Sequence, residues 1–126
     1  MQTEHLRQIL DYIDTYTPGT PTFGRFYMRR CLVNVHEIVK NDKTYKLDEW
    51  ISFMYQHFDL CTKLVINDIS IANETRSGLP VYTVELKSQQ TVNSEVYNVV
   101  DKQQYTFYHH TPLIKGIIHN VEFEKV

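Results

Sequence analysis

Residues 50 to 72 read WISFMYQHFDLCTKLVINDISIA, and the spacing of apolar side chains changes in the middle of this stretch. Before Cys61, apolar residues recur at helical spacing, as Trp50, Met54 and Phe58 do, which predicts one buried face of a helix. After Cys61, the segment LVINDISIA is rich in Val and Ile, as strands are. The stretch therefore predicts a change from helix to strand near Cys61.

Two further helices are predicted before this point. The first carries its apolar residues on one helix face, at Leu6, Ile9, Leu10 and Ile13. The segment TPGTP at 17–21 ends it, because two prolines and a glycine do not continue a helix. A short second helix follows in TFGRFYMRRC at 22–31. We therefore expect three helices within residues 3–60.

Four long strands are predicted after Cys61. They are rich in Val, Ile, Tyr and Thr and are separated by turn-forming residues, and they span 64–72, 81–92, 95–108 and 113–123. Helices first and strands last is the order of an α+β fold, and short links between sequential strands favour antiparallel pairing. We expect a curved antiparallel sheet over residues 63–125, wrapped around the three N-terminal helices.

Length and charge narrow the class of protein. A chain of 126 residues suits a single domain, residues 1–126, and the formal net charge of −2 gives no general attraction to nucleic acid or to an acidic membrane surface. No segment reaches the roughly 18 continuous apolar residues of a membrane span, and MQTEHLRQIL lacks the order of a signal peptide. We expect a soluble cytoplasmic domain that binds neither nucleic acid nor membrane.

Motifs for metals and cofactors are not apparent. Cys31 and Cys61 form no CxxC pair, and the sequence contains neither HExxH nor HxH. Apart from His36 and the pair at 109–110 in a predicted turn, the histidines are scattered, at His5, His57 and His119. We therefore expect neither a metal site nor a cofactor.

One carboxylate continues an apolar pattern. In VNVHE, at 33–37, strand alternation would place Glu37 on the same face as Val33 and Val35. Two interpretations follow: a carboxylate on the inner wall of a pocket, or a strand end that has reached water. Burial would raise the pKa of Glu37 above its usual value of about 4.3 and would suit it to act as a general base.

The order of elements resembles that of the nuclear transport factor 2-like superfamily. The nearest likeness is to its ketosteroid isomerase and SnoaL-like polyketide cyclase branches, and it is carried by the run from Tyr12 through TPGTPTFGRFYMRR to VNVHE. The resemblance implies a cone-shaped domain with a central pocket and no cofactor. It also implies a homodimer joined through the outer face of the sheet.

The resemblance also implies roles for particular residues. Glu37 falls where ketosteroid isomerases keep their proton-transferring carboxylate, and Tyr12 falls near their oxyanion-binding tyrosine, with Tyr16 as a rival. Gln103 matches the position of their second oxyanion group, which is a protonated aspartic acid on a late strand. Asp101 lies on the same strand face and could substitute for it.

Aromatic residues suggest the lining of a pocket. The candidates for ligand contact are Tyr16, Tyr27, His36, Trp50 and Tyr105, of which His36 reaches the cleft only if its strand is bulged. Three functions remain open: binding of a small, largely apolar molecule in a tyrosine-rimmed pocket, an isomerase, cyclase or dehydratase that uses Glu37, and a non-catalytic protein-interaction module.

The strands carry apolar side chains on both predicted faces. They include Val81, Thr83, Val96, Val100, Ile117 and Val121. One sheet face would cover the helices, and the other would pack on a second copy of the chain.

Overall fold

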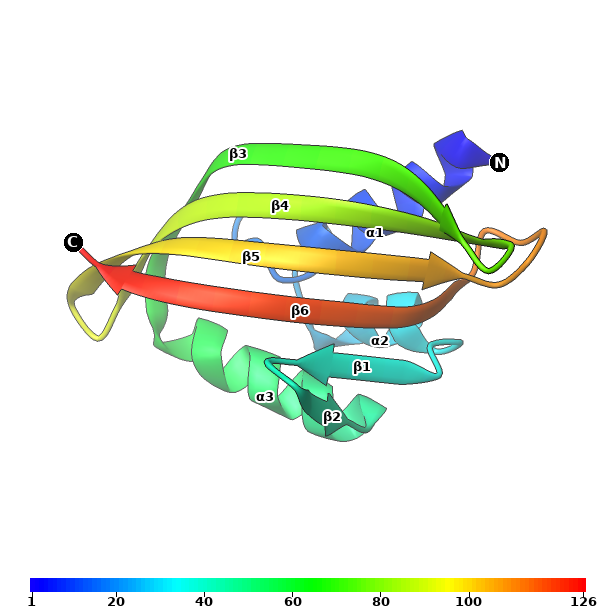
Figure 1. Ribbon diagram of the computed structural model, residues 1–126. Helices are drawn as coiled ribbons and strands as arrows, with labels where there is room; N and C mark the ends of the chain where they lie inside the picture. The colour runs from blue at the N-terminus through cyan, green and yellow to red at the C-terminus, as the bar shows by residue number, and fades with distance from the viewer.

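The computed structural model describes residues 1–126 as three helices followed by the long strands of one sheet, with a short hairpin between the second and third helices (Figure 1). The helices are α1 (Gln2–Asp14), α2 (Arg25–Leu32) and α3 (Leu47–Leu60). The strands are β1 (Glu37–Lys40), β2 (Lys43–Tyr45), β3 (Cys61–Arg76), β4 (Leu79–Val92), β5 (Glu95–Phe107) and β6 (Ile114–Lys125). The predicted α+β fold is confirmed, and the change from helix to strand falls at Cys61.

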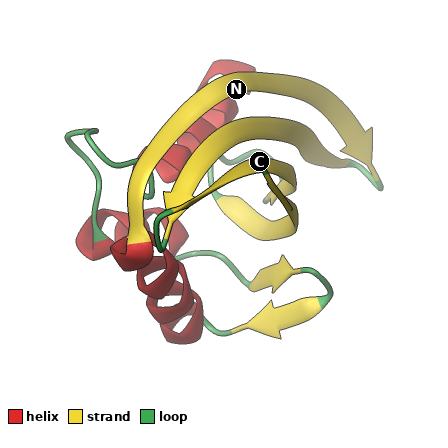
Figure 2. Ribbon diagram, turned by 90° about the vertical axis from the view of Figure 1, so that its left-hand side faces the viewer, coloured by secondary structure: helices red, strands yellow, loops and turns green.

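The six strands form one sheet in the order β2-β1-β6-β5-β4-β3. Every neighbouring pair is antiparallel except β1 and β6, which are parallel. Register shifts between Ile66 and Asp68 and between Thr106 and Phe107 bend the long strands, because a bulge adds a residue to one strand only. The sheet arches over the helices, which lie on its inner side (Figure 2).

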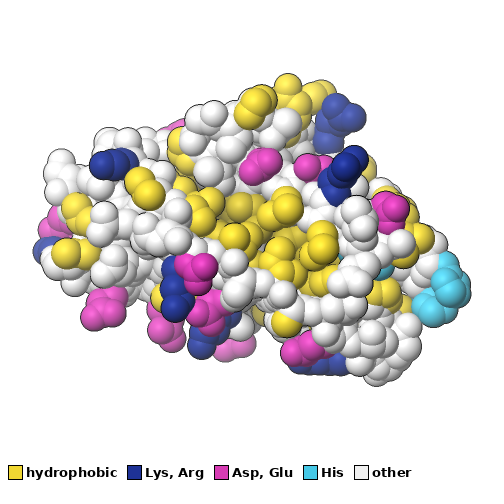
Figure 3. Space-filling view, turned by 90° about the horizontal axis from the view of Figure 1, so that it is seen from above, with side chains coloured by type: hydrophobic (Ala, Val, Ile, Leu, Met, Phe, Trp, Pro, Cys, Tyr) yellow, Lys and Arg dark blue, Asp and Glu magenta, His cyan; other side chains and the backbone are white.

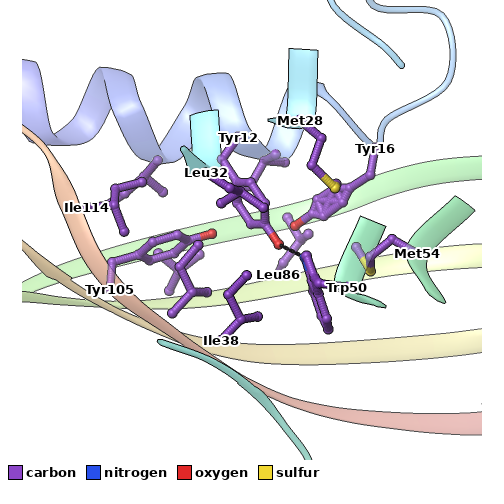
Figure 4. Packing of buried hydrophobic residues seen from close by; sticks show 14 of the residues in the cluster. Tyr12, Tyr16, Met28, Leu32, Ile38, Trp50, Met54, Leu86, Tyr105 and Ile114 are labelled. Atoms are coloured by element: carbon purple, nitrogen blue, oxygen red, sulfur yellow. Dashed lines mark hydrogen bonds between the residues drawn. The ribbon is translucent and has the colours of Figure 1, made fainter. Parts of the chain in front are cut away.

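The core fills the space between the helices and the inner face of the sheet. Side chains from α1, α3 and β5 meet there, with Tyr12, Trp50 and Tyr105 each fully buried (Figure 4). Ile38 from β1 and Leu86 from β4 belong to the same cluster. None of the helices is both long and apolar enough to cross a membrane.

The second helix begins at a glycine for a steric reason. Gly24 precedes α2 with φ 145° and ψ 161°, a backbone conformation that is essentially restricted to glycine. The turn here brings α2 back towards α1, and the Gly24 N–H donates to the Thr15 carbonyl oxygen at 3.1 Å. A glycine inside a predicted helix is thus explained, since the helix starts after it.

The strand predicted from Val33 starts later than expected. Val33 keeps helical angles, φ −58° and ψ −29°, at the end of α2, and the sheet begins only at Glu37. Within β1 it is Ile38 that faces the core, with 3% of its surface exposed, so its neighbour Glu37 points outward and is exposed. The expectation that Glu37 lines the inner wall of a pocket is therefore wrong, because the apolar face was counted from Val33 and Val35, which lie in the turn between α2 and β1.

Two of the apolar residues named on the predicted strands lie on the inner face of the sheet. Ile117 is completely buried in the core, and Val121, four residues further along β6, faces the same side. Polar side chains on the outer face of the four long strands include Ser70, Thr83, Glu85, Lys102, Gln104 and Asn120. The outer face is thus more polar than the sequence pattern suggested.

Candidate functional site

A chain of hydrogen bonds crosses the core from β5 to α3. The Asp101 carboxylate lies 3.0 Å from His119 Nδ1, and His119 Nε2 lies 3.0 Å from the Tyr12 hydroxyl oxygen. The Trp50 indole N–H donates to the same hydroxyl oxygen at 3.1 Å. Two strands and two helices therefore each contribute one polar group to a single buried chain.

The partners fix where each hydrogen lies when His119 is neutral. An ionised carboxylate only accepts, so His119 Nδ1 carries the hydrogen and donates it to Asp101. His119 Nε2 then accepts from the Tyr12 hydroxyl, which in turn accepts from Trp50. Burial raises the pKa of Tyr12 well above its ordinary value, so the phenol keeps its hydrogen and acts as a donor.

A second branch of the network runs through Gln103. Its amide nitrogen donates to Asp101 Oδ2 at 2.8 Å and to the Tyr16 hydroxyl oxygen at 2.8 Å, while Tyr105 donates to its amide oxygen. The carboxylate of Asp101 fixes this orientation of the amide, because it cannot donate. Tyr16 consequently accepts from Gln103, and its own hydroxyl hydrogen is left for another acceptor.

A cavity of about 50 Å³ lies next to this network, between α3 and the inner face of the sheet. Such a volume holds the centres of about three to five water molecules. Its wall is mainly hydrophobic, with aromatic and aliphatic side chains from α3 and the sheet, and Asp101 and His119 form part of the wall. The lining residues that matter below are Tyr16, Lys40, Trp50, Phe53, His57, Ser88, Asp101 and His119.

A further polar pair lies on the cavity wall away from Asp101. His57 Nε2 and Gln90 Oε1 are 2.8 Å apart, and the Gln90 amide donates to the Ser88 hydroxyl at 3.3 Å. Since an amide oxygen only accepts, His57 Nε2 carries a hydrogen. Burial lowers the pKa of His57, which favours the neutral ring.

Six of the residues predicted from the sequence come together here. Tyr16, Trp50 and Asp101 line the cavity, whereas three others lie behind its wall, fully buried in the network: Tyr12, Gln103 and Tyr105. The latter three therefore hold the lining residues in place rather than meeting a ligand. Asp101 itself keeps 13% of its side chain exposed.

Three predicted residues lie elsewhere. Tyr27 is exposed on α2, with 37% of its surface accessible. His36 and Glu37 are exposed and belong to a separate depression of about 210 Å³, which they share with Lys115. This depression lies on the outer side of the sheet, because Glu37 points away from Ile38 and the core. The expectation that these three residues line an interior pocket is therefore wrong.

The structure also brings in residues that were not predicted from the sequence. The most important is His119, which is 1% exposed and links Asp101 to Tyr12. The signal for it was available in β6, where Ile117, His119 and Val121 alternate on one face. Lys40 could have been found in the same way, because it lies two residues after buried Ile38 and therefore faces the same side.

Comparison with solved structures defines the class of fold. A protein of Shewanella denitrificans assigned as a SnoaL-like polyketide cyclase superposes with a TM-score of 0.64 at 11% identity, covering 94% of this chain and 90% of that one. A conserved protein of Planctomyces limnophilus gives 0.67 at 10% identity, covering 98% and 97%. AclR of Streptomyces galilaeus, assigned as a hydroxylase, gives 0.58 at 6% identity, covering 98% and 91%.

The chain thus has the nuclear transport factor 2-like fold in its SnoaL-like form, as its sequence resemblance implied. No protein-family model matches the sequence, and no curated protein matches it either. At these identities the likeness is one of fold, so function has to be argued from the cavity and its residues.

Proposed function

We propose that the domain binds a small, largely apolar molecule in the cavity between α3 and the sheet. The observation that carries the proposal is the unused hydroxyl hydrogen of Tyr16 on the wall of a mainly hydrophobic cavity. Burial raises the pKa of Tyr16 well above its ordinary value, so this hydrogen stays in place at neutral pH. An apolar wall with a few fixed polar groups is typical of small-molecule sites.

The proposal is tested by filling the cavity. Trp50 lines it and is the single tryptophan of the chain, so its fluorescence reports what enters. We expect several members of a library of small ketones, amides and acids to change this fluorescence. Ser88→Leu should abolish the response, because Ser88 is 5% exposed and its side chain faces the cavity.

Gln89→Leu is the matched control, since Gln89 is the next residue of β4 and is exposed on the opposite face. It should leave the fluorescence response unchanged. A response that survives Ser88→Leu with the fold intact would contradict binding in this cavity.

A second candidate function is proton transfer by Asp101. This carboxylate reaches the cavity and is held by donors from His119 and Gln103, so it is positioned to take a proton from a bound molecule. The Shewanella neighbour is assigned as a polyketide cyclase, which supports a reaction of this general kind. In this form of the proposal Asp101 replaces Glu37 as the base of an isomerase, cyclase or dehydratase.

We also propose that two copies pair through the outer face of the sheet. The three helices all lie on the inner side, so the outer face has no cover within the chain (Figures 1 and 2). It carries a broad depression of about 520 Å³, and Lys102 and Glu85 stand in register across β4 and β5. Light scattering at micromolar concentration should give twice the chain mass of 15.0 kDa.

Lys102→Glu should shift this equilibrium towards single chains, because it places like charges together on the paired faces. Arg7→Glu, at an exposed position of α1 away from the outer face of the sheet, is the control for the change of net charge. A mass of one chain for the unaltered protein would contradict the pairing.

A further inference from the structure

A lysine stands in line with the buried polar network. Lys40 is the last residue of β1 and is the register partner of His119 on β6, which is in turn the partner of Gln103 on β5. Lys40 follows buried Ile38 by two residues, so its side chain leaves the same inner face. A row of three polar side chains therefore crosses three strands towards the cavity, and Lys40 is at its outer end.

The ammonium group of Lys40 has an aromatic partner but no anionic one. Its Nζ lies 4.4 Å from the centroid of the Phe53 ring, and both residues line the cavity. The ion pairs of the molecule include those of Lys87 and Lys125 with glutamates, but none includes Lys40. Lys40 is also the only Lys or Arg in the cavity wall.

The one acidic group of the wall is already occupied. Asp101 accepts from His119 Nδ1 and from Gln103, and it lies beyond ion-pair distance of Lys40. Burial lowers the pKa of Lys40, while the charge of Asp101 raises it. A half-buried cation without a counter-ion gains from any anion that enters beside it.

We propose that the ligand of this cavity is a small carboxylate whose charged group pairs with Lys40 and whose short hydrocarbon part lies along Phe53 towards Trp50. The inference rests on the proposed binding function and specifies its ligand class. Repulsion from Asp101 orients the molecule, because the carboxylate must lie on the Lys40 side and the uncharged end on the Asp101 side. The cavity of about 50 Å³ limits the enclosed part to a few heavy atoms.

The test compares crotonate with crotonamide, which have the same shape and differ in charge at neutral pH. Trp50 fluorescence gives both dissociation constants. We expect crotonate to bind roughly tenfold more tightly, as a hydrogen-bonded charge pair would give. Lys40→Met keeps the length of the side chain and should remove this preference, whereas Lys40→Arg should retain most of it.

Lys43→Met is the matched control. Lys43 also lies over an aromatic ring, 5.0 Å from the centroid of Tyr45, but it is exposed on β2 and does not line the cavity. It should leave the preference for the acid unchanged. Loss of the preference in Lys40→Met alone supports the inference.

Two results would overturn it, and they are distinguishable. Equal binding of crotonate and crotonamide, blocked in both cases by Ser88→Leu, would leave the binding function standing but refute the ligand class. A fluorescence response to neither these two compounds nor the wider library would refute the binding function as well.

Discussion

Replacement of Tyr12 by Phe is expected to lower the free energy of unfolding by about 2–4 kcal/mol, although it removes a single oxygen atom. That oxygen accepts from the Trp50 indole N–H and donates to His119 Nε2. Tyr12 and Trp50 are completely buried, so no solvent replaces the missing partner. The variant leaves one buried donor and one buried acceptor unpaired, and each such group costs about 1–3 kcal/mol.

Urea unfolding followed by circular dichroism measures this change as a shift of the midpoint at constant slope. Tyr97→Phe is the control, since its hydroxyl donates to the Glu95 carboxylate at an exposed position. That change should cost less than about 0.5 kcal/mol. Similar small losses of unfolding free energy for both variants would show that the buried hydrogen bonds do not hold the helices to the sheet.

Replacement of Asp101 by Asn is expected to lower any proton-transfer activity by roughly 10²–10⁴ while preserving the fold. The amide oxygen of Asn still accepts from His119 Nδ1, so the buried ring keeps a partner. Rotation of the Gln103 amide would then present its oxygen to the new amide group and to the Tyr16 hydroxyl. Asp101→Ala leaves His119 and Gln103 without this acceptor, so it should also lower the free energy of unfolding by about 2–4 kcal/mol.

Proton transfer is measured without knowing the natural substrate. Small enolisable ketones are incubated with the protein in deuterated water, and the loss of their acidic protons is followed by nuclear magnetic resonance. Glu37→Gln makes the same chemical change at an exposed carboxylate and should leave the exchange rate unchanged. If Glu37→Gln lowered the rate and Asp101→Asn did not, Asp101 would be excluded as the base.

The division between helices and sheet was predictable because periodicity is a local property. The apolar spacing changes at Cys61, and the chain changes there from α3 to β3. Alternation along β5 also placed Asp101 and Gln103 on one face, and the network contains both. In both cases the residues that carry the pattern lie within one regular element.

The position of Glu37 was not predictable in the same way. Its face was counted from Val33, which follows α2 and keeps helical backbone angles, so the two-residue alternation of a strand does not apply there. The turn at 33–36 breaks the alternation before β1 begins at Glu37, so Ile38 is buried and Glu37 is exposed. Alternation predicts faces reliably only when the first residue of the strand is known.

The contribution of His119 depends on contacts between distant parts of the chain. It meets Tyr12 across 107 positions and Asp101 across 18, and neither distance in space follows from the sequence pattern. The two-residue period in β6 is that of an inward-facing ring at His119, but it does not identify the partners of that ring. The packing of α1 against the sheet decides them.

The edge of the sheet formed by β3 bears on how the protein behaves at high concentration. This strand has 16 residues and no neighbour on its outer side, so it offers a long row of backbone donors and acceptors to another molecule. Hydrophobic side chains gather in the middle of the face seen from above, the side on which β3 lies (Figure 3). Within β3, Val65 and Ile69 are 43% and 37% exposed. The bulge between Ile66 and Asp68 divides the edge into two shorter runs and places a charge after the break. The irregularity that bends the strand over the helices therefore also protects the protein against open-ended growth of the sheet from one molecule to the next.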